Sequence, residues 1–395
     1  MMMRLAITGL ITSVGLMAAG PTFAQAAPAG PPIIGFEVPA EPGIVQRNWA
    51  IGLENPWGIA WLPDGRALVT ERGGRLRIVS KDGRIGAPVN GLPAVATVGQ
   101  GGLLDVSVHP NFARNGLVYF THSVGTADAN VTALSRGTLS GNMLTGVKEL
   151  LRNPTAKTGG AHFGSRMQWL PDGTLLMSVG DGGNPNIKFD GDDIRNLAQN
   201  PKAFFGKVLR VTGEGGPVNN NPGVIDPKLG WDRRVWSMGH RNIQGLARDP
   251  KTGVIWATEH GARGGDELNR LAAGGNHGWP IVTYSVEYSG KPITQERSRP
   301  GFRDPVSVWT PSIGASGLAV YRGNAMPGLD GALLAGGLVS GDVRVLRLGA
   351  NGRPGPERRI EMGARVRDVK VGPDGFVYVL TDEEAGRIIQ LRPAG

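Results

Sequence analysis

Two residues that could form a general base and its partner stand at the two ends of one predicted hairpin. His162 lies in Gly-Gly-Ala-His-Phe-Gly-Ser-Arg, and Asp181 lies in Gly-Asp-Gly-Gly. If residues 165–181 form a hairpin, its ends lie side by side, and the aspartate can accept a hydrogen bond from one imidazole nitrogen. The other nitrogen then remains free to take a proton. A histidine bonded to the turn backbone is the alternative, and the sequence leaves both interpretations open.

Arginine residues provide candidate anion sites at two places. Arg241 and Asn242 lead into an apolar run; they could project into a pore or form a solvated loop, and the sequence favours neither. Arg365 and Arg367 flank Val366, and side chains two apart on a strand point the same way. Two guanidinium groups on one face suit a carboxylate or a phosphate. A solvent-facing pair is the alternative.

An oxygen-rich segment, residues 259–267, is a candidate calcium site. Its sequence Glu-His-Gly-Ala-Arg-Gly-Gly-Asp-Glu combines carboxylates with flexible backbone, and calcium prefers oxygen ligands, including carbonyls. The spacing is not that of an EF-hand, and no second histidine stands four residues after His260, as a zinc motif requires. A triad hydrolase is disfavoured, because the chain lacks both a Gly-x-Ser-x-Gly elbow and cysteine.

Six segments share one layout that could position these residues. Each has an apolar run, a turn rich in Pro, Asp or Gly, and a second apolar run, and a third short run follows several of them. The segments are 58–72, 104–122, 165–181, 244–261, 316–338 and 367–383. Alternation predicts strands with one buried face, and Asp-Gly or Asn-Gly between two runs predicts a tight hairpin. Six repeats of three or four strands predict an all-β protein, a six-bladed β-propeller.

A β-sandwich or two smaller β domains are the competing architectures. Six copies in phase are hard to place in either one. Between the copies, residues 182–235 and 262–312 are predicted as long insertions, and residues 192–200 as one short helix. Long loops on a rigid scaffold are where function concentrates.

The first 26 residues have the anatomy of a secretory signal peptide. A basic start is followed by an apolar stretch at 5–19 and by Ala-Gln-Ala at 24–26. A membrane anchor is the alternative, but the apolar stretch is interrupted and shorter than the roughly 20 residues that a span needs. We therefore expect residues 27–395 to form a single propeller domain, periplasmic or secreted, without a stable membrane span.

The charge of the chain favours anionic partners. The formal net charge is +9, which attracts anions in general. The basic residues are scattered, without the aromatic–basic ladder that tracks a nucleic acid strand. We expect no nucleic acid partner, and a small ligand with several carboxylates would suit this charge.

As an ordered set, the motifs resemble the soluble pyrroloquinoline quinone (PQQ)-dependent sugar dehydrogenases, a glucose/sorbosone dehydrogenase-like family, and most closely its aldose sugar dehydrogenase branch. The similar segments cover nearly the whole mature chain: NPWGIAWLPDG (55–65), GQGGLLDVSVHP (99–110), HFGSRMQWLPDG (162–173), GHRNIQGLARDP (239–250), EHGARGGDELNRL (259–271), GNHGWP (275–280) and RVRDVKVGPDG (365–375).

The resemblance implies an enzyme that oxidises the anomeric hydroxyl of aldoses to lactones, with PQQ and Ca²⁺ as cofactors. His162 would be the base, Asp181 would orient it, and Arg241 would stabilise charge on the quinone. The electron acceptor that reoxidises the enzyme is not identified by the resemblance.

The resemblance also implies the ligand contacts. PQQ would be held by Arg241, Asn242, Arg365, Val366 and Arg367, and by backbone near Gly337, Leu338 and Val339. Gln100 and Tyr288 would line the sugar site. One calcium would bind the carbonyls of Gly261 and Ala262 together with the cofactor, and a second would bind Glu267 and the backbone of His277.

Three positions depart from the pattern of these relatives, and two other functions compete. Ala262 replaces a frequent proline, Val339 falls where some members have a lysine, and Ala161 falls where some have a carboxylate. A calcium-dependent propeller lactonase would need several carboxylates that converge on the pore. A non-catalytic propeller that binds a glycan or a protein would need no base–carboxylate pair.

Overall fold

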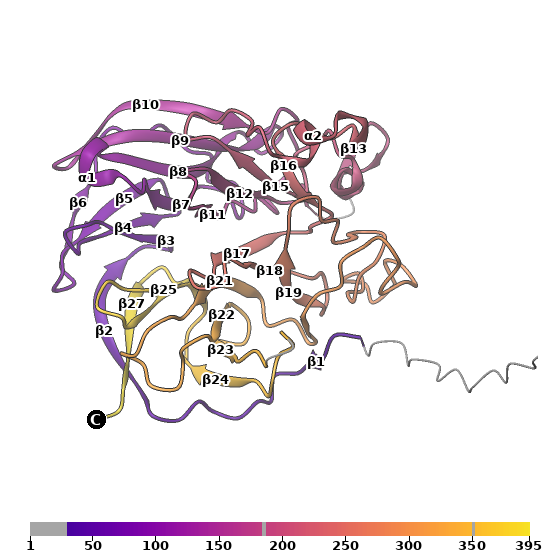
Figure 1. Ribbon diagram of the computed structural model, residues 1–395. Coiled ribbons are helices and arrows are strands. Elements are labelled where there is room, and N and C mark those ends of the chain that lie inside the picture. The colour runs from indigo at the N-terminus through magenta and orange to yellow at the C-terminus, as the bar shows by residue number, and fades with distance from the viewer. Residues whose placement is uncertain (1–29, 184–186, 350–351) are drawn as a thin grey trace, which may run out of the picture. The chain divides into compact units, whose positions relative to one another are not determined.

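Six sheets of four or five strands follow one another along residues 31–395 and surround a common centre (Figure 1). The computed structural model describes residues 30–183, 187–349 and 352–395, so the predicted signal peptide at 1–26 lies outside the described residues. The first strand of each sheet packs against the first strands of the neighbouring sheets. The predicted all-β, six-bladed propeller is confirmed. In the described part of the chain, no helix is long and apolar enough to span a membrane.

Blades 1 to 3 occupy the first half of this unit. Blade 1 consists of β3 (Pro56–Trp61), β4 (Ala67–Glu71), β5 (Arg75–Val79) and β6 (Ile85–Pro88). Blade 2 consists of β7 (Leu103–Val108), β8 (Leu117–Gly125), β9 (Asn130–Ser140) and β10 (Met143–Arg152), with the short helix α1 (Phe112–Asn115). Blade 3 consists of β11 (Met167–Trp169), β12 (Leu175–Val179), β15 (Lys207–Val211) and β16 (Val235–Met238). Its loops carry β13 (Lys188–Phe189), β14 (Asp192–Asp193), η1 (Ile194–Gln199), α2 (Pro222–Ile225) and η2 (Pro227–Leu229).

Blades 4 to 6 follow in the same order. Blade 4 consists of β17 (Ile243–Arg248), β18 (Ile255–Glu259), β19 (Asp266–Leu271) and β20 (Ser307–Trp309), to which β1 (Ile33–Ile34) adds in parallel. Blade 5 consists of β21 (Ala315–Val320), β22 (Leu333–Gly337), β23 (Asp342–Leu346) and β24 (Arg358–Glu361). Blade 6 consists of β25 (Val366–Val371), β26 (Val377–Thr381), β27 (Gly386–Pro393) and the N-terminal strand β2 (Ile44–Leu53).

The six predicted hairpins coincide with the first two strands of the six blades, but the predicted insertions contain blade strands as well. Residues 182–235 include β15, and residues 262–312 include β19 and β20. Long loops separate β15 and β20 from their partners and hid them from a search for short hairpins, whereas β19 follows its partner β18 after residues 260–265. The helix predicted at 192–200 is the 3-10 helix η1.

The ring of blades is closed by the two ends of the described chain. β2 pairs antiparallel with β27, from Ile44 opposite Pro393 to Leu53 opposite Gly386. Figure 1 shows the indigo β2 beside the yellow β27. The last blade is therefore completed by the first long strand, and a ring closed in this way leaves only short sheet edges exposed.

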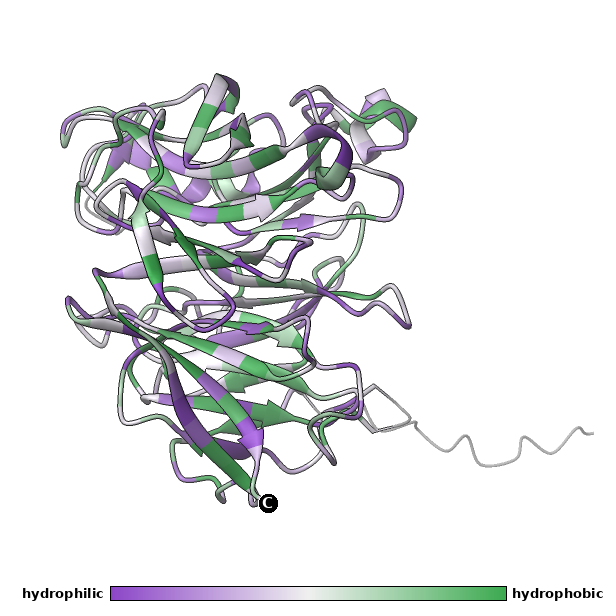
Figure 2. Ribbon diagram, turned by 90° about the vertical axis from the view of Figure 1, so that its left-hand side faces the viewer, coloured by the Kyte–Doolittle hydropathy of each residue, from purple (hydrophilic) through white to green (hydrophobic). Residues whose placement is uncertain are grey.

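The hydrophobic core consists of six clusters, each between two neighbouring blades, and of a small seventh cluster formed by Trp57, Leu104 and Phe163. The second strand of a blade is consequently covered on both faces: every residue of β4, β12, β18, β22 and β26 is buried. The prediction of one buried face per strand is wrong for these strands. In Figure 2, green hydrophobic and purple hydrophilic stretches alternate along several of the strands.

The first strand of each blade is its inner strand, and one position on these strands forms a ring around the centre. This position lies three residues before the last residue of the strand; in blade 3 it is the residue just before β11. Its occupants in blades 1 to 6 are Gly58, Asp105, Arg166, Gly245, Gly317 and Asp368. The glycines make room for their neighbours. A Cβ on Gly58 would lie 2.7 Å from Asp105 Oδ1, and one on Gly317 would lie 2.2 Å from Asp368 Oδ1.

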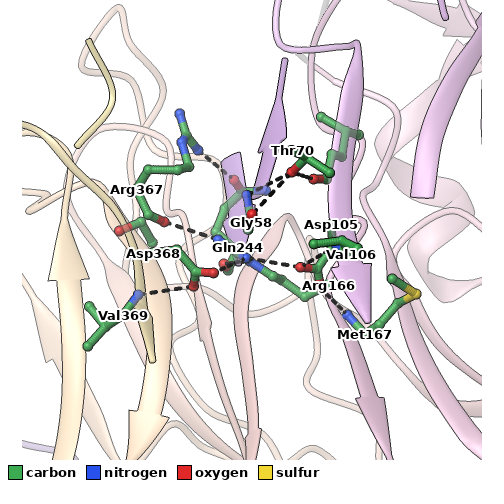
Figure 3. Close-up of polar contacts among 12 residues, drawn as sticks. Gly58, Thr70, Asp105, Val106, Arg166, Met167, Gln244, Arg367, Asp368 and Val369 are labelled. Atoms are coloured by element: carbon green, nitrogen blue, oxygen red, sulfur yellow. Dashed lines mark hydrogen bonds and ion pairs between the residues drawn. The ribbon is translucent and has the colours of Figure 1, made fainter. Parts of the chain in front are cut away.

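Arg166 connects this ring (Figure 3). Its Nη1 lies 3.0 Å from Asp368 Oδ2 and 3.4 Å from Asp105 Oδ1. Its Nε donates to the carbonyl of Gln244 at 2.6 Å, and its Nη2 donates to that of Arg367 at 3.0 Å. The side chain is 1% exposed, so a full charge is held away from water by two carboxylates and two carbonyls. Removing one partner from such a group leaves the others buried and unpaired.

We expect Arg166→Met to lower the free energy of unfolding by about 3–5 kcal/mol, because Asp105 and Asp368 lose their buried counterion. Urea denaturation followed by tryptophan fluorescence measures the change. The triple variant Asp105→Asn/Arg166→Met/Asp368→Asn removes all three charges and should recover part of the loss. A single variant as stable as the wild type would show that the three charges do not depend on one another.

Candidate functional site

His162 and Asp181 are brought together by the hairpin of β11 and β12. Ser165 N–H donates to the carbonyl of Ser178 at 2.8 Å, so the chain segments on either side run together. His162 Nδ1 lies 2.6 Å from Asp181 Oδ1, and both side chains are buried. The structure places the pair in contact, as the hairpin predicts. The role of His162 as a base stays a prediction.

The His162 ring is held neutral and with one nitrogen available. Burial lowers the pKa of His162, and the Arg241 charge lowers it further, whereas Asp181 raises it. With Nδ1 bonded to the aspartate, the proton of the neutral ring lies on Nδ1 and Nε2 carries a lone pair. No side chain or backbone group of the described residues bonds to Nε2. A neutral imidazole with a free acceptor nitrogen is what a general base needs.

The backbone of His162 is fixed as tightly as its side chain. Its φ is 54°, a left-handed conformation that costs a non-glycine residue energy. Its N–H donates to Gln100 Oε1 at 2.9 Å. A Cβ on Gly180 would lie 2.2 Å from the carbonyl oxygen of His162, so that glycine is required for the close approach. Gln100, predicted to line the sugar site, thus lies directly against the candidate base.

Trp279 supports the aspartate, and sequence reasoning did not find it. Its Nε1 donates to Asp181 Oδ2 at 2.8 Å, while Oδ1 also accepts from Gly183 N–H at 3.0 Å. Its ring lies 5.4 Å from the Arg241 guanidinium. The motif GNHGWP contains this tryptophan, but only contact across about a hundred residues of chain gives it a partner. Trp279 therefore links the carboxylate to the cation of the site.

Arg241 and Asn242 are buried rather than part of a solvated loop. Arg241 Nη1 donates to the carbonyls of Gly261 at 2.6 Å and His260 at 3.1 Å. Its N–H donates to Glu259 Oε2 at 2.6 Å. Asn242 Oδ1 accepts from Gly164 N–H at 3.1 Å, but its Nδ2 is buried without a partner among the described residues. An unpartnered amide is a donor that a ligand could use.

A cavity of about 250 Å³ opens at the beginnings of the inner strands. The aromatic and aliphatic part of its lining is Trp57, Leu104, Phe163 and Leu338, and the polar part is Asn55, Arg72, Gln100, Gln244, His260, Arg365, Arg367 and Asp382. Three guanidinium groups face a single carboxylate. The cavity therefore favours a flat, anionic ligand.

Arg365 and Arg367 both reach Asp382, which sequence reasoning missed. Asp382 Oδ2 lies 3.1 Å from Arg365 Nη2 and 3.0 Å from Arg367 Nη2. Arg365 Nη1 also donates to the carbonyl of Leu338 at 3.1 Å, and Arg367 Nη1 to Gln244 Oε1 at 3.2 Å. The two arginines lie on one side, as predicted. Asp382 follows the second strand of its blade as Asp181 does in blade 3, and that parallel was the available signal.

The other predicted contact residues are more dispersed. Gly337 is buried and Val339 is 62% exposed beside it. Val366 is fully buried in the core between blades 5 and 6, so only its main chain could contact a ligand. Tyr288 is outside the 250 Å³ cavity and lines a small neighbouring space with Arg241, Trp279 and Ala262.

The predicted calcium ligands lie in an acidic, buried region. Asn269 Nδ2 bridges Glu259 Oε1 at 2.7 Å and Glu267 Oε2 at 3.0 Å. Burial raises the pKa of Glu267 to about 8, and the neighbouring Glu259 charge adds to this rise. Both ring nitrogens of His277 are buried without partners among the described residues. A cation here would offset the cost of the buried Glu259 carboxylate and of the half-buried Glu267 carboxylate.

Side-chain clustering alone does not identify these metal sites. Within residues 30–183, 187–349 and 352–395, no group of three or more His, Asp or Glu side chains is arranged to hold a metal. The implied sites rely on main-chain carbonyls instead, which calcium accepts as ligands. The Gly261 carbonyl is one of them, and Arg241 occupies it in this structure.

Comparison with known proteins gives one consistent match. The family model Glucose / Sorbosone dehydrogenase matches residues 53–390. An uncharacterised Synechocystis protein, slr1608, is 50% identical over 350 residues, 86% of this chain and 84% of that protein. The aldose sugar dehydrogenase YliI of Escherichia coli is 35% identical over 349 residues, 86% of this chain and 91% of that protein.

Solved structures agree. The apo form of the soluble aldose sugar dehydrogenase from Escherichia coli has a TM-score of 0.81 at 34% identity, covering 88% of this chain and 99% of that one. The PQQ-bound form of an aldose sugar dehydrogenase from Streptomyces coelicolor has a TM-score of 0.69 at 28% identity, covering 90% of this chain and 99% of that one.

We expect Trp279→Phe to lower the free energy of unfolding by about 1.5–3 kcal/mol, because Asp181 loses a hydrogen bond to its buried charge. Trp61→Phe is the matched control, since the buried Nε1 of Trp61 has no partner among the described residues. Both variants keep an aromatic ring, so urea denaturation isolates the hydrogen bond. Equal losses in the two variants would contradict this account.

Proposed function

Since the chain belongs to the Glucose / Sorbosone dehydrogenase family, we propose that it is a PQQ- and calcium-dependent oxidoreductase that converts aldoses to lactones by oxidising the anomeric hydroxyl. The observation that carries the proposal is the buried His162–Asp181 pair beside a cavity with three guanidinium groups. The proposed location is periplasmic or extracellular, and the electron acceptor is a further partner whose chemistry is open.

The residues present fit PQQ. The cofactor is flat and carries three carboxylates, which match a cavity with an aromatic wall and three arginines. The Nδ2 of Asn242 and the Nε of Arg367 are buried donors without partners among the described residues, and an acceptor on the ligand would satisfy them. Arg365 and Arg367, which line the cavity, would hold the group together with Arg241 and Asn242, which lie outside its lining.

The residues also fit calcium at the carbonyls of Gly261 and Ala262, but one contact has to change. Arg241 donates to the Gly261 carbonyl at 2.6 Å, and a cation bound to that oxygen would displace the guanidinium. The freed guanidinium then becomes available to the cofactor. The second calcium would lie at Glu267 and the backbone of His277, where its charge would favour ionised carboxylates.

His162, Asp181 and Arg241 perform the chemistry that the chain itself supplies. Bound PQQ supplies a quinone that can accept a hydride. His162 Nε2 takes the proton from the anomeric hydroxyl, so that the carbon–oxygen double bond of the lactone can form as the C1–H bond breaks. Asp181 stabilises the imidazolium that results. Arg241 offers a preorganised positive charge in a water-poor site, the arrangement that stabilises developing negative charge.

Sugar binding would involve the residues between the base and the outer surface. Gln100 touches the backbone of His162, and Tyr288, which is 59% exposed, lies near Arg241 and Trp279. A lactonase would need several carboxylates in the pore. Asp382, the one carboxylate that lines the cavity, is paired with two arginines.

We expect purified protein loaded with PQQ and calcium to reduce a redox dye with glucose or another aldose, and His162→Ala to bind PQQ but lose about a hundredfold or more of turnover, because general-base catalysis is removed. PQQ binding is read from its absorption spectrum, and turnover from dye reduction. Calcium chelation should abolish the wild-type activity. A His162→Ala enzyme with normal turnover would remove His162 from the mechanism.

We expect Arg367→Ala to weaken PQQ binding by roughly tenfold or more, because one charge-assisted contact is lost. Arg367→Lys should restore part of it, since an ammonium cannot reproduce the planar fork. Isothermal titration calorimetry at fixed calcium measures the affinity.

Loss of both arginines would also leave Asp382 unpaired and able to repel the ligand. The triple variant Arg365→Ala/Arg367→Ala/Asp382→Asn therefore separates lost attraction from new repulsion. We expect the triple variant to bind PQQ more weakly than the wild type and more tightly than the double arginine variant. Wild-type affinity in the triple variant would show that the arginines do not bind the cofactor.

A further inference from the structure

A second cavity, of about 590 Å³, lies at the ends of the inner strands. Its lining includes the last residues of four of them: Trp169, Arg248, Val320 and Val371. The 250 Å³ cavity lies at the beginnings of the inner strands, and the two cavities share no lining residue. Arg166 of the inner ring lies between these two levels of the strands, bonded to the carbonyls of Gln244 and Arg367. The second cavity is therefore separate from the proposed active site.

The volume of this cavity results from small side chains on the inner strands. The residue two positions after the ring residue points to the same side of its strand. In blades 4 and 5 it is Ala247 and Ala319, and in blades 3 and 6 it is Gln168 and Lys370. All four line the cavity. The alanines leave space that the two longer side chains border without filling.

The charged residues in the lining are all cationic. Arg248 and Lys370 are half-buried, and among the residues that the structure describes no Asp or Glu lines the cavity. Neither cation has an ion pair within the described part of the chain. The carboxylates nearest in sequence are already paired, since Asp368 binds Arg166 and Asp249 binds Arg322 at 2.7 Å. Lys370 interacts electrostatically with the buried Asp105 carboxylate without forming an ion pair with it. Two partly desolvated cations that contact no carboxylate form a site that an anion would stabilise.

The lining also offers a neutral donor and an apolar wall. Trp169 Nε1 is buried and has no partner among the described residues. His109 Nδ1 accepts from Asn111 N–H at 2.9 Å, so the proton of the neutral ring lies on Nε2. The indole of Trp169 and the side chains of Val320 and Val371, all half-buried, supply apolar surface.

We propose that this second cavity binds a small organic anion, with its carboxylate or sulfonate near Lys370 and Arg248 and its aromatic or aliphatic body against Trp169 and Val371. The proposal does not depend on the sugar oxidation proposed above. It concerns a different set of residues at the other end of the inner strands.

The probe is 1-anilinonaphthalene-8-sulfonate, titrated into the full purified chain and followed by fluorescence and calorimetry. We expect one saturable site, and we expect Lys370→Gln and Arg248→Gln each to weaken binding about tenfold, as loss of a charge-assisted contact implies. Lys228→Gln changes an exposed lysine of η2 and should leave the affinity for the probe unchanged. Arg365→Ala tests the cationic cavity at the strand beginnings, and it should also leave the affinity for this probe unchanged.

Competition shows whether the anionic group matters. 2-Naphthoate should displace the probe, and the neutral 2-naphthalenemethanol should displace it at least tenfold less well, because only the carboxylate meets the cations. Circular dichroism and melting curves confirm that each variant is folded. Binding that does not saturate, that survives both Lys370→Gln and Arg248→Gln, or that is lost in Arg365→Ala instead, would overturn the proposal.

Discussion

Arg166 places a positive charge where blades 2, 3, 4 and 6 meet. Two carboxylates and two carbonyls surround it, and the indole of Trp57 lies 4.1 Å from its guanidinium. Replacing Arg166 alone would be strongly destabilising, because Asp105 and Asp368 would then be buried without a counterion. Gly58 and Gly317 occupy the equivalent positions in blades 1 and 5, where a larger side chain would overlap Asp105 or Asp368. The ring thus sets how closely the inner strands approach one another at this level.

The acidic residues near the ends of the second strands serve three different purposes on one repeated scaffold. Asp181 in blade 3 binds His162, Glu259 in blade 4 accepts from the backbone of Arg241, and Asp382 in blade 6 binds two arginines. Each carboxylate fixes a cation or an imidazole that borders the site. Because the strands are covered on both faces, these anchors are held in a nearly dry environment, where electrostatic interactions are strong.

How much of this structure the sequence predicts depends on how far apart in the chain the contacting residues lie. The hairpins were predictable because a turn and its two flanking runs lie within about twenty residues, and the contact of His162 with Asp181 follows from one of them. Trp279 was not predictable in the same way, because its partner Asp181 lies 98 residues away in the chain. Asp382 lies 17 residues from Arg365 and 15 from Arg367 in the hairpin of β25 and β26, so its contacts were within reach of the same argument and were overlooked. The strands β15 and β20 were missed because long loops separate them from the strands they pair with, and β19 was missed because residues 259–267 were interpreted as a calcium-binding segment although β19 follows β18 after residues 260–265.

The contacts within the candidate site bear on how tightly any ligand can bind. Arg241, Arg365 and Arg367 are not free, since each already donates to a carbonyl, a carboxylate or an amide oxygen. A bound anion would exchange these partners for its own oxygens, and only the difference in free energy would appear as affinity. A single carboxylate gains little from such an exchange, because Asp382 already offers the same chemistry to two of the arginines. A ligand with several carboxylates and a flat ring gains more, because it meets several guanidinium groups at once and also covers the aromatic wall. The site therefore selects by the number and spacing of negative charges as much as by charge itself.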